Sequence, residues 1–189
     1  MQISPRWVTQ PLTVFVIAVL QTYRFRLSTS GPWSAKVRGM LTPGDIAPAV
    51  DLHDQDDLTF DWTALRGHRT LLFFYPKAST PGCTQQACGL RDIVGQVGDV
   101  AIVGVSPDKP AAQKKFADKY ELPYPLLADI DHALADAYGV WKEKKNYGRT
   151  YMGIERSAFL IGPDGVLEQA WYKISPKDTP LKLLAALAS

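Results

Sequence analysis

Three short and almost unbroken runs of apolar residues constrain the fold of this chain more than any other feature. They occupy residues 69–75, 99–106 and 157–162, and Pro76 ends the first of them. A strand that is buried on both faces of a sheet has this pattern, because its side chains alternate between the faces and both sets must be apolar. The sequence therefore predicts a sheet that is covered on both sides.

Segments with helical features lie between and after these runs. Residues 110–120 begin with Pro110, which suits the first position of a helix. Residues 132–138 are followed by Gly139, and glycine commonly terminates helices. The last segment, 179–188, carries leucines at helical spacing. We therefore predict a helix in each of the three segments.

A turn sequence follows the third apolar run. Pro163, Asp164 and Gly165 predict a turn into a strand over 166–172, so the last two strands should form a hairpin. The basic run at 142–145 is expected to be a solvated loop. Alternation of strands and helices, then a hairpin and a final helix, is typical of an α/β fold with right-handed crossovers. We expect a thioredoxin-like fold, with a mixed central sheet flanked by helices.

The charge of the chain changes near residue 39. Residues 1–39 contain five basic and no acidic side chains, whereas residues 40–189 contain 16 basic and 19 acidic ones. The mildly acidic character of the larger part argues against a nucleic-acid partner. Residues 40–189 have the size of one domain, so we interpret residues 1–39 as an N-terminal extension.

Three interpretations of the extension stay open. In the first, Met40 is the true start and residues 1–39 are mis-assigned, which predicts a cytoplasmic protein. In the second, the extension directs the chain to the envelope or to an organelle. In the third, it is a structured addition to the domain. Its apolar run covers only residues 12–20, whereas a membrane-spanning helix needs about 20 residues. We therefore expect no integral membrane span.

Cysteine and histidine are scarce, with two and three residues respectively. Two cysteines are too few for a disulfide-stabilised scaffold or for a zinc site made of cysteines alone. The histidines, His53, His68 and His132, show no metal-ligand spacing relative to the cysteines. No metal or other cofactor is expected.

Cys83 lies in the segment that follows the first apolar run. Thr80 and Pro81 suit the N-cap and the first position of a helix, which makes Cys83 the third helical residue. Ligands of open α/β sheets bind beyond the carboxyl ends of strands, which is where this cysteine falls. Unpaired N–H groups and the helix dipole would favour its thiolate form. The alternative is an inert buried cysteine.

Cys88 follows five residues later in the same predicted helix. In a regular helix the two Cα atoms would lie about 8–9 Å apart, whereas a disulfide needs roughly 4.4–6.8 Å. Cys83 and Cys88 could therefore bond only after the helix unwinds, and Gly89 would lower the cost of unwinding. Either the two cysteines form such a redox pair, or Cys88 is unrelated to Cys83.

The pattern Pro76-x3-Thr80-x2-Cys83 resembles the peroxidatic motif of the peroxiredoxins. Residues 74–92 are similar in particular to the bacterioferritin comigratory protein, or peroxiredoxin Q, subfamily. That subfamily often places a resolving cysteine five residues after the peroxidatic one. Two later segments, 138–142 and 151–157, match the same pattern. The resemblance covers about residues 41–188 and none of the extension.

This resemblance implies a thiol-dependent peroxidase that serves in antioxidant defence. Cys83 would attack hydrogen peroxide or an organic hydroperoxide and become a sulfenic acid. Thr80 and Arg156 would hold the thiolate and the peroxide, and Pro76 would shield the sulfur from solvent. Arg91, two turns after the nucleophile, is expected to support Arg156.

The resemblance also implies how the enzyme returns to its reduced form. Cys88 would form an intramolecular disulfide with Cys83, and thioredoxin or a glutaredoxin-type protein would reduce it. Because both cysteines belong to one predicted helix, no second subunit is needed, and we expect a monomer.

Two other classes of protein are considered for the same fold. A thiol-disulfide oxidoreductase would normally carry Cys-x-x-Cys, whereas four residues separate Cys83 from Cys88. A non-catalytic chaperone or binding module would have no need of Pro76, Thr80 and Arg156, which are all present. The response of the two thiols to hydrogen peroxide would separate these classes.

Overall fold

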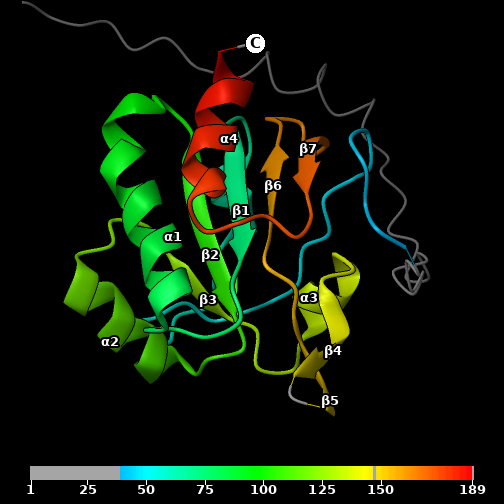
Figure 1. The fold of residues 1–189 in the computed structure, drawn as a ribbon. Helices are drawn as coiled ribbons and strands as arrows, with labels where there is room; N and C mark the ends of the chain where they lie inside the picture. The colour runs from blue at the N-terminus through cyan, green and yellow to red at the C-terminus, as the bar shows by residue number, and fades with distance from the viewer. Residues whose placement is uncertain (1–38, 147, 189) are drawn as a thin grey trace, which may run out of the picture. The chain divides into compact units, whose positions relative to one another are not determined.

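A five-stranded mixed sheet forms the centre of the computed structural model, which describes residues 39–146 and 148–188 (Figure 1). The strands lie in the order β3-β2-β1-β6-β7. Their bounds are Thr70–Phe74 for β1, Ala101–Ser106 for β2, Leu126–Ala128 for β3, Ser157–Ile161 for β6 and Leu167–Trp171 for β7. Strands β1, β2 and β3 run parallel, whereas β6 is antiparallel to both β1 and β7. The predicted mixed sheet is confirmed.

The three apolar runs form the three central strands, as the sequence predicts. Every residue of β1 and β6 is buried, and in β2 only Ala101 is partly exposed. The strand after the third run, β7, pairs with β6, so the predicted hairpin is also confirmed. The short strand β3 was not predicted, because three residues are too few to show a periodicity.

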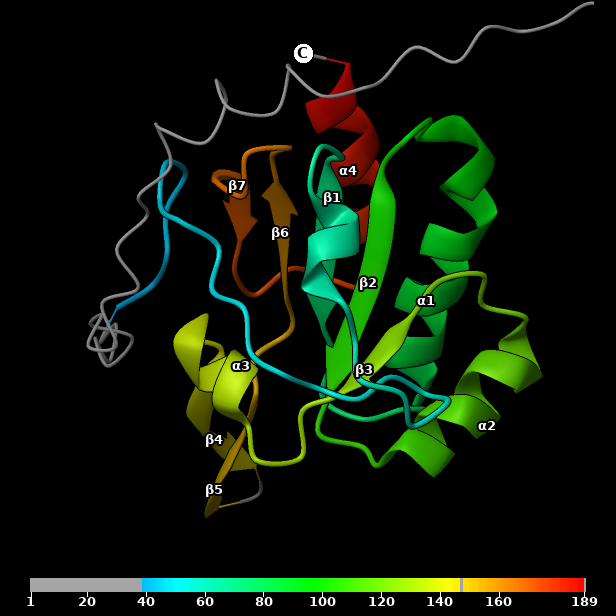
Figure 2. The same cartoon turned by 180° about the vertical axis from the view of Figure 1, so that it is seen from behind.

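Helices cover both faces of this sheet (Figures 1 and 2). Three of them, α1 (Pro81–Ile93), α2 (Pro110–Tyr120) and α4 (Asp178–Leu187), pack on one face, and α3 (Ala133–Ala137) packs on the other. The helices lie where the sequence predicts them, and α2 has the predicted bounds. Alternate residues of β1 belong to the two apolar layers, which explains why that strand shows no polar face.

Gly104 of β2 lies where two large side chains leave no room for a methyl group. A Cβ atom there would be 2.7 Å from Cδ2 of Leu126 and 2.8 Å from Cζ of Phe73. We expect Gly104→Ala to lower the free energy of unfolding by about 1–3 kcal/mol, because the core must shift to accept the methyl group. Urea denaturation measures the change. Gly95→Ala is the matched control, since nothing lies within 4 Å of its would-be Cβ; equal stability of the two variants would contradict this view of the core.

A separate two-stranded sheet replaces the solvated loop expected at 142–145, so that prediction is wrong. The strands β4 (Trp141–Asn146) and β5 (Arg149–Ile154) form an antiparallel hairpin. The hairpin is anchored at its base, where Trp141 pairs with Ile154, whose side chain is 1% exposed. The charged residues in between have no apolar alternation, so nothing in their pattern reveals a strand.

The predicted N-terminal extension spans residues 1–39, of which 1–38 lie outside the described part of the chain. The division at residue 39 therefore stays a prediction. Over residues 39–146 and 148–188, no helix has the length and apolar character that crossing a membrane requires.

Candidate active site

Cys83 lies in the first turn of α1, just after the loop that leaves β1. Its side chain is 1% exposed and packs in the apolar layer between α1 and the sheet. Ala87 and Leu90 of the same helix belong to this layer, and their spacing from Cys83 is that of one helical face. The sulfur is therefore in the first helical turn and faces the sheet, where the sequence predicts it.

Thr80 occupies the predicted N-cap position, but its side chain does not cap the helix. Its hydroxyl Oγ1 donates to the carbonyl oxygen of Lys77 at 3.1 Å instead. The turn between these residues includes Ser79 with φ of 60°, and it brings the carbonyl within reach. The lone pairs of the Thr80 hydroxyl are therefore not committed to the N–H groups of α1.

Arg156 reaches the sulfur of Cys83 from a distant part of the chain. Its Nη2 donates to Sγ of Cys83 at 3.3 Å. The sheet register explains the contact, since Phe74 at the end of β1 pairs with Ser157 at the start of β6. A Cβ atom on Gly82 would lie 3.4 Å from Nη2 of Arg156, so the small residue before the cysteine leaves room for the guanidinium.

Gln86 is a site residue that the sequence analysis missed. It is fully buried, its Oε1 accepts a hydrogen bond from Nη1 of Arg156, and its Nε2 donates to Oγ1 of Thr179 at 3.0 Å. Gln86 follows Cys83 by three residues and shares its helix face. A polar residue on the buried face of a predicted helix was the signal in the sequence that could have indicated a role for Gln86.

Arg91 was expected to support Arg156. Its guanidinium instead donates to the carbonyl of Tyr120 at 2.7 Å and forms an ion pair with the neighbouring Asp92.

The loop from Pro76 to Thr80 is held by a carboxylate at the end of β2. Oδ2 of Asp108 accepts from the backbone N–H of Ala78 at 2.7 Å and from the hydroxyl of Ser106 at 2.8 Å. Pro76 itself is half-buried. These bonds tie the loop before Cys83 to the neighbouring parallel strand.

A buried chain of polar groups continues from Ser106 toward β1. The amide of Gln113 donates to the Ser106 hydroxyl at 2.9 Å, and the hydroxyl of Tyr75 donates to Oε1 of Gln113. Burial raises the pKa of Tyr75, so this phenol stays a neutral hydrogen-bond donor. Tyr75 immediately precedes Pro76, so the network fixes the strand end from which the loop departs.

Cys88 is half-buried in α1, and both cysteines are free thiols. The start of α4 and the residues before it pack directly on the part of α1 that carries them. Cβ atoms on Gly82 and Gly89 would lie 3.4 Å from Cγ of Pro176 and 3.3 Å from Cγ of Pro180, respectively. Unwinding of α1 between the cysteines would therefore also separate it from these prolines.

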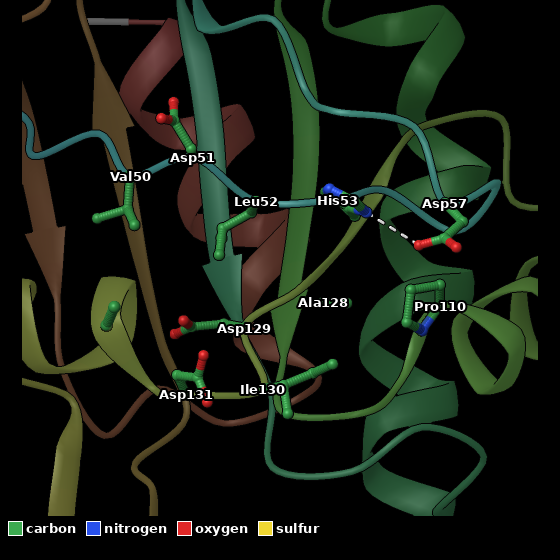
Figure 3. A pocket seen from close by; sticks show the side chains of 11 residues that line it. Val50, Asp51, Leu52, His53, Asp57, Pro110, Ala128, Asp129, Ile130 and Asp131 are labelled. Atoms are coloured by element: carbon green, nitrogen blue, oxygen red, sulfur yellow. Dashed lines mark hydrogen bonds and ion pairs between the residues drawn. The ribbon is translucent and has the colours of Figure 1, made fainter.

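A pocket lies elsewhere in the described part of the chain, at the carboxyl end of β3 (Figure 3). Its volume is about 310 Å³, and it is lined by three exposed or partly exposed aspartates, by His53 and by the buried Asp129, but by none of the predicted site residues. Burial raises the pKa of Asp129, whose carboxylate accepts from the backbone N–H groups of Leu134 and Ala135. Asp129 therefore holds the start of α3.

Among the described residues, no group of acidic, histidine and cysteine side chains is arranged to hold a metal ion.

Residues 43–170 match the AhpC/TSA family. The chain belongs to this family. Peroxiredoxin Bcp of Escherichia coli is 47% identical over 133 residues, which cover 69% of this chain and 85% of that protein. Peroxiredoxin Bcp of Bacillus subtilis is 44% identical over 146 residues, which cover 76% of this chain and 93% of that protein.

Solved structures agree with this assignment. Peroxiredoxin Q of Xanthomonas campestris, in a cysteine-to-serine form, has a TM-score of 0.70 at 34% identity and covers 79% of this chain and 96% of its own. Peroxidoxin BcpB of Mycobacterium tuberculosis has a TM-score of 0.69 at 32% identity, covering 79% and 97%. The resemblance to the Bcp and peroxiredoxin Q subfamily and the thioredoxin-like fold are confirmed. The protein is a peroxiredoxin, an oxidoreductase that reduces peroxides with a thiol.

Proposed function

We propose that Cys83 is the peroxidatic nucleophile of this peroxiredoxin. The observation that carries the proposal is the 3.3 Å contact between its buried sulfur and the guanidinium of Arg156. The thiolate would attack one peroxide oxygen, forming an S–O bond as the O–O bond breaks. The second oxygen leaves with the bonding electron pair, takes a proton and departs as water or an alcohol, and Cys83 remains as a sulfenic acid.

The surrounding groups suit the charges in this reaction. The Arg156 cation lies beside the sulfur, where it would favour the thiolate and donate a hydrogen bond to the oxygen that develops negative charge. The hydroxyl of Thr80, which does not cap α1, can turn toward the peroxide. Pro76 presents no N–H group and, half-buried at the end of β1, would limit the access of water to Cys83.

Cys88 is proposed as the resolving cysteine. Its thiol would attack the sulfenic sulfur and expel water, giving an intramolecular disulfide. Both residues belong to the continuous helix α1, so the bond requires unwinding between them. The packing of Pro180 against Gly89 would have to open in the same step.

A dithiol protein, thioredoxin or a glutaredoxin-type protein, is proposed to reduce this disulfide. Hydrogen peroxide and organic hydroperoxides are the proposed substrates. Alkyl peroxide reduction has been studied in the Bacterioferritin Comigratory Protein of Xanthomonas campestris, which is 34% identical to this chain. Resolution within one helix supports a monomer. Residues 40–189 are proposed as the functional domain, in the cytoplasm if the chain starts at Met40.

A thiol titration tests this sequence of steps. The reduced protein is mixed with one equivalent of hydrogen peroxide, and free thiols are counted. We expect both thiols to disappear, because one peroxide oxidises Cys83 and Cys88 then forms the disulfide. The Cys88→Ser variant should still reduce one peroxide but should lose turnover with thioredoxin, thioredoxin reductase and NADPH. Undiminished turnover of Cys88→Ser would assign resolution to another thiol, and intact thiols at micromolar peroxide would contradict the nucleophile itself.

A further inference from the structure

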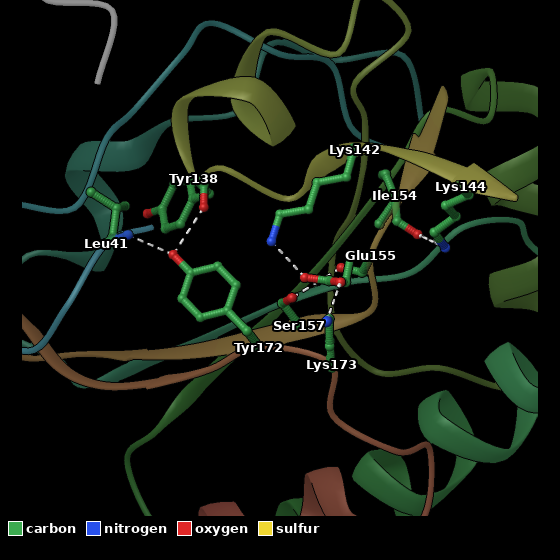
Figure 4. A network of polar contacts seen from close by, with 9 residues as sticks. All are labelled: Leu41, Tyr138, Lys142, Lys144, Ile154, Glu155, Ser157, Tyr172 and Lys173. Atoms are coloured by element: carbon green, nitrogen blue, oxygen red, sulfur yellow. Dashed lines mark hydrogen bonds and ion pairs between the residues drawn. The ribbon is translucent and has the colours of Figure 1, made fainter. Parts of the chain in front are cut away.

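Two lysines of the β4–β5 hairpin hold the residues that lead into Arg156 (Figure 4). The ammonium group of Lys144 donates to the carbonyl oxygen of Ile154. The ammonium group of Lys142 lies 2.7 Å from Oε1 of Glu155, whose side chain is only 14% exposed. The two lysines therefore contact the two residues that precede Arg156 in the chain.

The backbone carbonyls of Ile154, Glu155 and Arg156 each accept a hydrogen bond. The hydroxyl of Ser157 donates to the carbonyl of Glu155 at 2.9 Å, and the N–H of Ile174 donates to that of Arg156 at 3.1 Å. The third carbonyl, that of Ile154, is the one held by a charged side chain. Because a charged donor makes a stronger hydrogen bond than a neutral one, Lys144 provides the firmest of these three attachments.

The path of Lys144 to this carbonyl follows from the hairpin itself. Lys144 pairs with Tyr151 across the strands, and Lys142 pairs with Gly153, so both lysines lie on one face. A Cβ atom on Gly153 would be 3.6 Å from Cδ of Lys144 and 3.3 Å from the Tyr151 ring. Because Gly153 has no side chain, the aliphatic stem of Lys144 can pass over it toward Ile154.

The ammonium group of Lys144 is also part of the charge environment of the reacting sulfur. Partial burial lowers the pKa of Lys144, the charges of Glu155 and Cys83 act to raise it, and Arg156 acts to lower it further. Tyr75 is a further titratable group near the sulfur. Burial raises the pKa of Tyr75, and the charge of Cys83 raises it further. The charges of both Cys83 and Arg156 therefore act on Lys144.

We propose that Lys144 is a positioning residue for peroxide reduction, which fixes the Ile154 carbonyl and thereby sets the Arg156 guanidinium on the sulfur of Cys83. This inference rests on the role proposed for Arg156 above. A guanidinium on a long side chain can point elsewhere, and a displacement of about 1 Å at a reacting centre can cost up to about a hundredfold in rate.

The experiment is a double-mutant cycle between Lys144 and Arg156. The second-order rate of Cys83 oxidation by hydrogen peroxide is measured by stopped flow for the full chain, for Lys144→Met, for Arg156→Met and for the double variant. Lys144→Met keeps the apolar stem and removes the ammonium group. Lys144→Gln is a second variant, and thermal unfolding establishes that each protein is folded. Lys145→Met is the matched control, because Lys145 is exposed and lies on the opposite face of the same strand.

Lys144→Met and Lys144→Gln should react about tenfold more slowly than the unmodified chain, and Lys145→Met should stay within twofold. In the Arg156→Met background the Lys144→Met change should have almost no further effect on the rate, because the guanidinium that Lys144 positions is absent. An equal slowing in both backgrounds, or a Lys144 effect no larger than that of Lys145, would overturn the proposal. If Arg156→Met reacts as fast as the unmodified chain, the proposed role of Arg156 fails instead, which is a different result.

Discussion

The Cys83→Ser variant is expected to lose peroxidase activity almost completely. Removing the nucleophile of an enzyme that works by covalent catalysis lowers the rate by about four to six orders of magnitude. Serine has nearly the same size and fits the buried site, but its hydroxyl is not ionised near neutral pH and cannot be oxidised by peroxide. The consumption of hydrogen peroxide with thioredoxin, thioredoxin reductase and NADPH measures the loss.

The Cys88→Ser variant is the matched control for this experiment, since it makes the same change five residues away in the same helix. It should keep a single turnover with peroxide, whereas Cys83→Ser should show none. Thermal unfolding of both variants checks that α1 is intact, because Cys83 is almost fully buried. Peroxide turnover that survives in Cys83→Ser would refute the assignment of the nucleophile.

Arg156→Met is expected to slow the reaction of Cys83 with peroxide by about a hundred- to a thousandfold. Loss of one donor that stabilises developing negative charge has an effect of this size. The guanidinium donates to Cys83 and to Gln86 at once, so its orientation as well as its charge is used. Stopped-flow measurement of the second-order rate tests the expectation.

Arg156→Lys separates charge from geometry. A lysine at this position keeps the charge but offers no planar pair of donors to reach Cys83 and Gln86 together. We expect Arg156→Lys to recover little of the rate of the unmodified chain. A lysine variant as fast as the unmodified chain would mean that the position of the guanidinium has no part in catalysis.

The central sheet and its main helices could be predicted because each depends on a pattern that is local in sequence. The strands β1, β2 and β6 are almost entirely apolar because both faces of the sheet are covered. The helix α1 starts at Pro81 and places Cys83 in its first turn, which the Thr-Pro pair and the apolar spacing after it were enough to indicate.

The missed features depend on partners that are distant in sequence. The hairpin β4–β5 has a charged strand, and its lysines find their partners at Ile154 and Glu155 only in the folded chain. Gln86 lies on a predicted helix, but its bonds join α1 to α4 at Thr179 and to the segment between β5 and β6 at Arg156. No periodicity indicates such contacts. The position of Cys83 could therefore be predicted from the sequence, whereas the contacts of Gln86 and of the hairpin lysines could not.

The contact between Cys83 and Arg156 joins residues that are 73 positions apart, and it depends on the antiparallel pairing of β1 with β6. The helix that carries Cys83 is local, whereas Arg156 arrives only when the sixth strand has been made and has inserted next to the first. Contacts between distant segments form late, after their loop-closure entropy has been overcome. During synthesis the chain therefore exposes a cysteine without its arginine, and rapid reaction with peroxide should appear only when the sheet is complete.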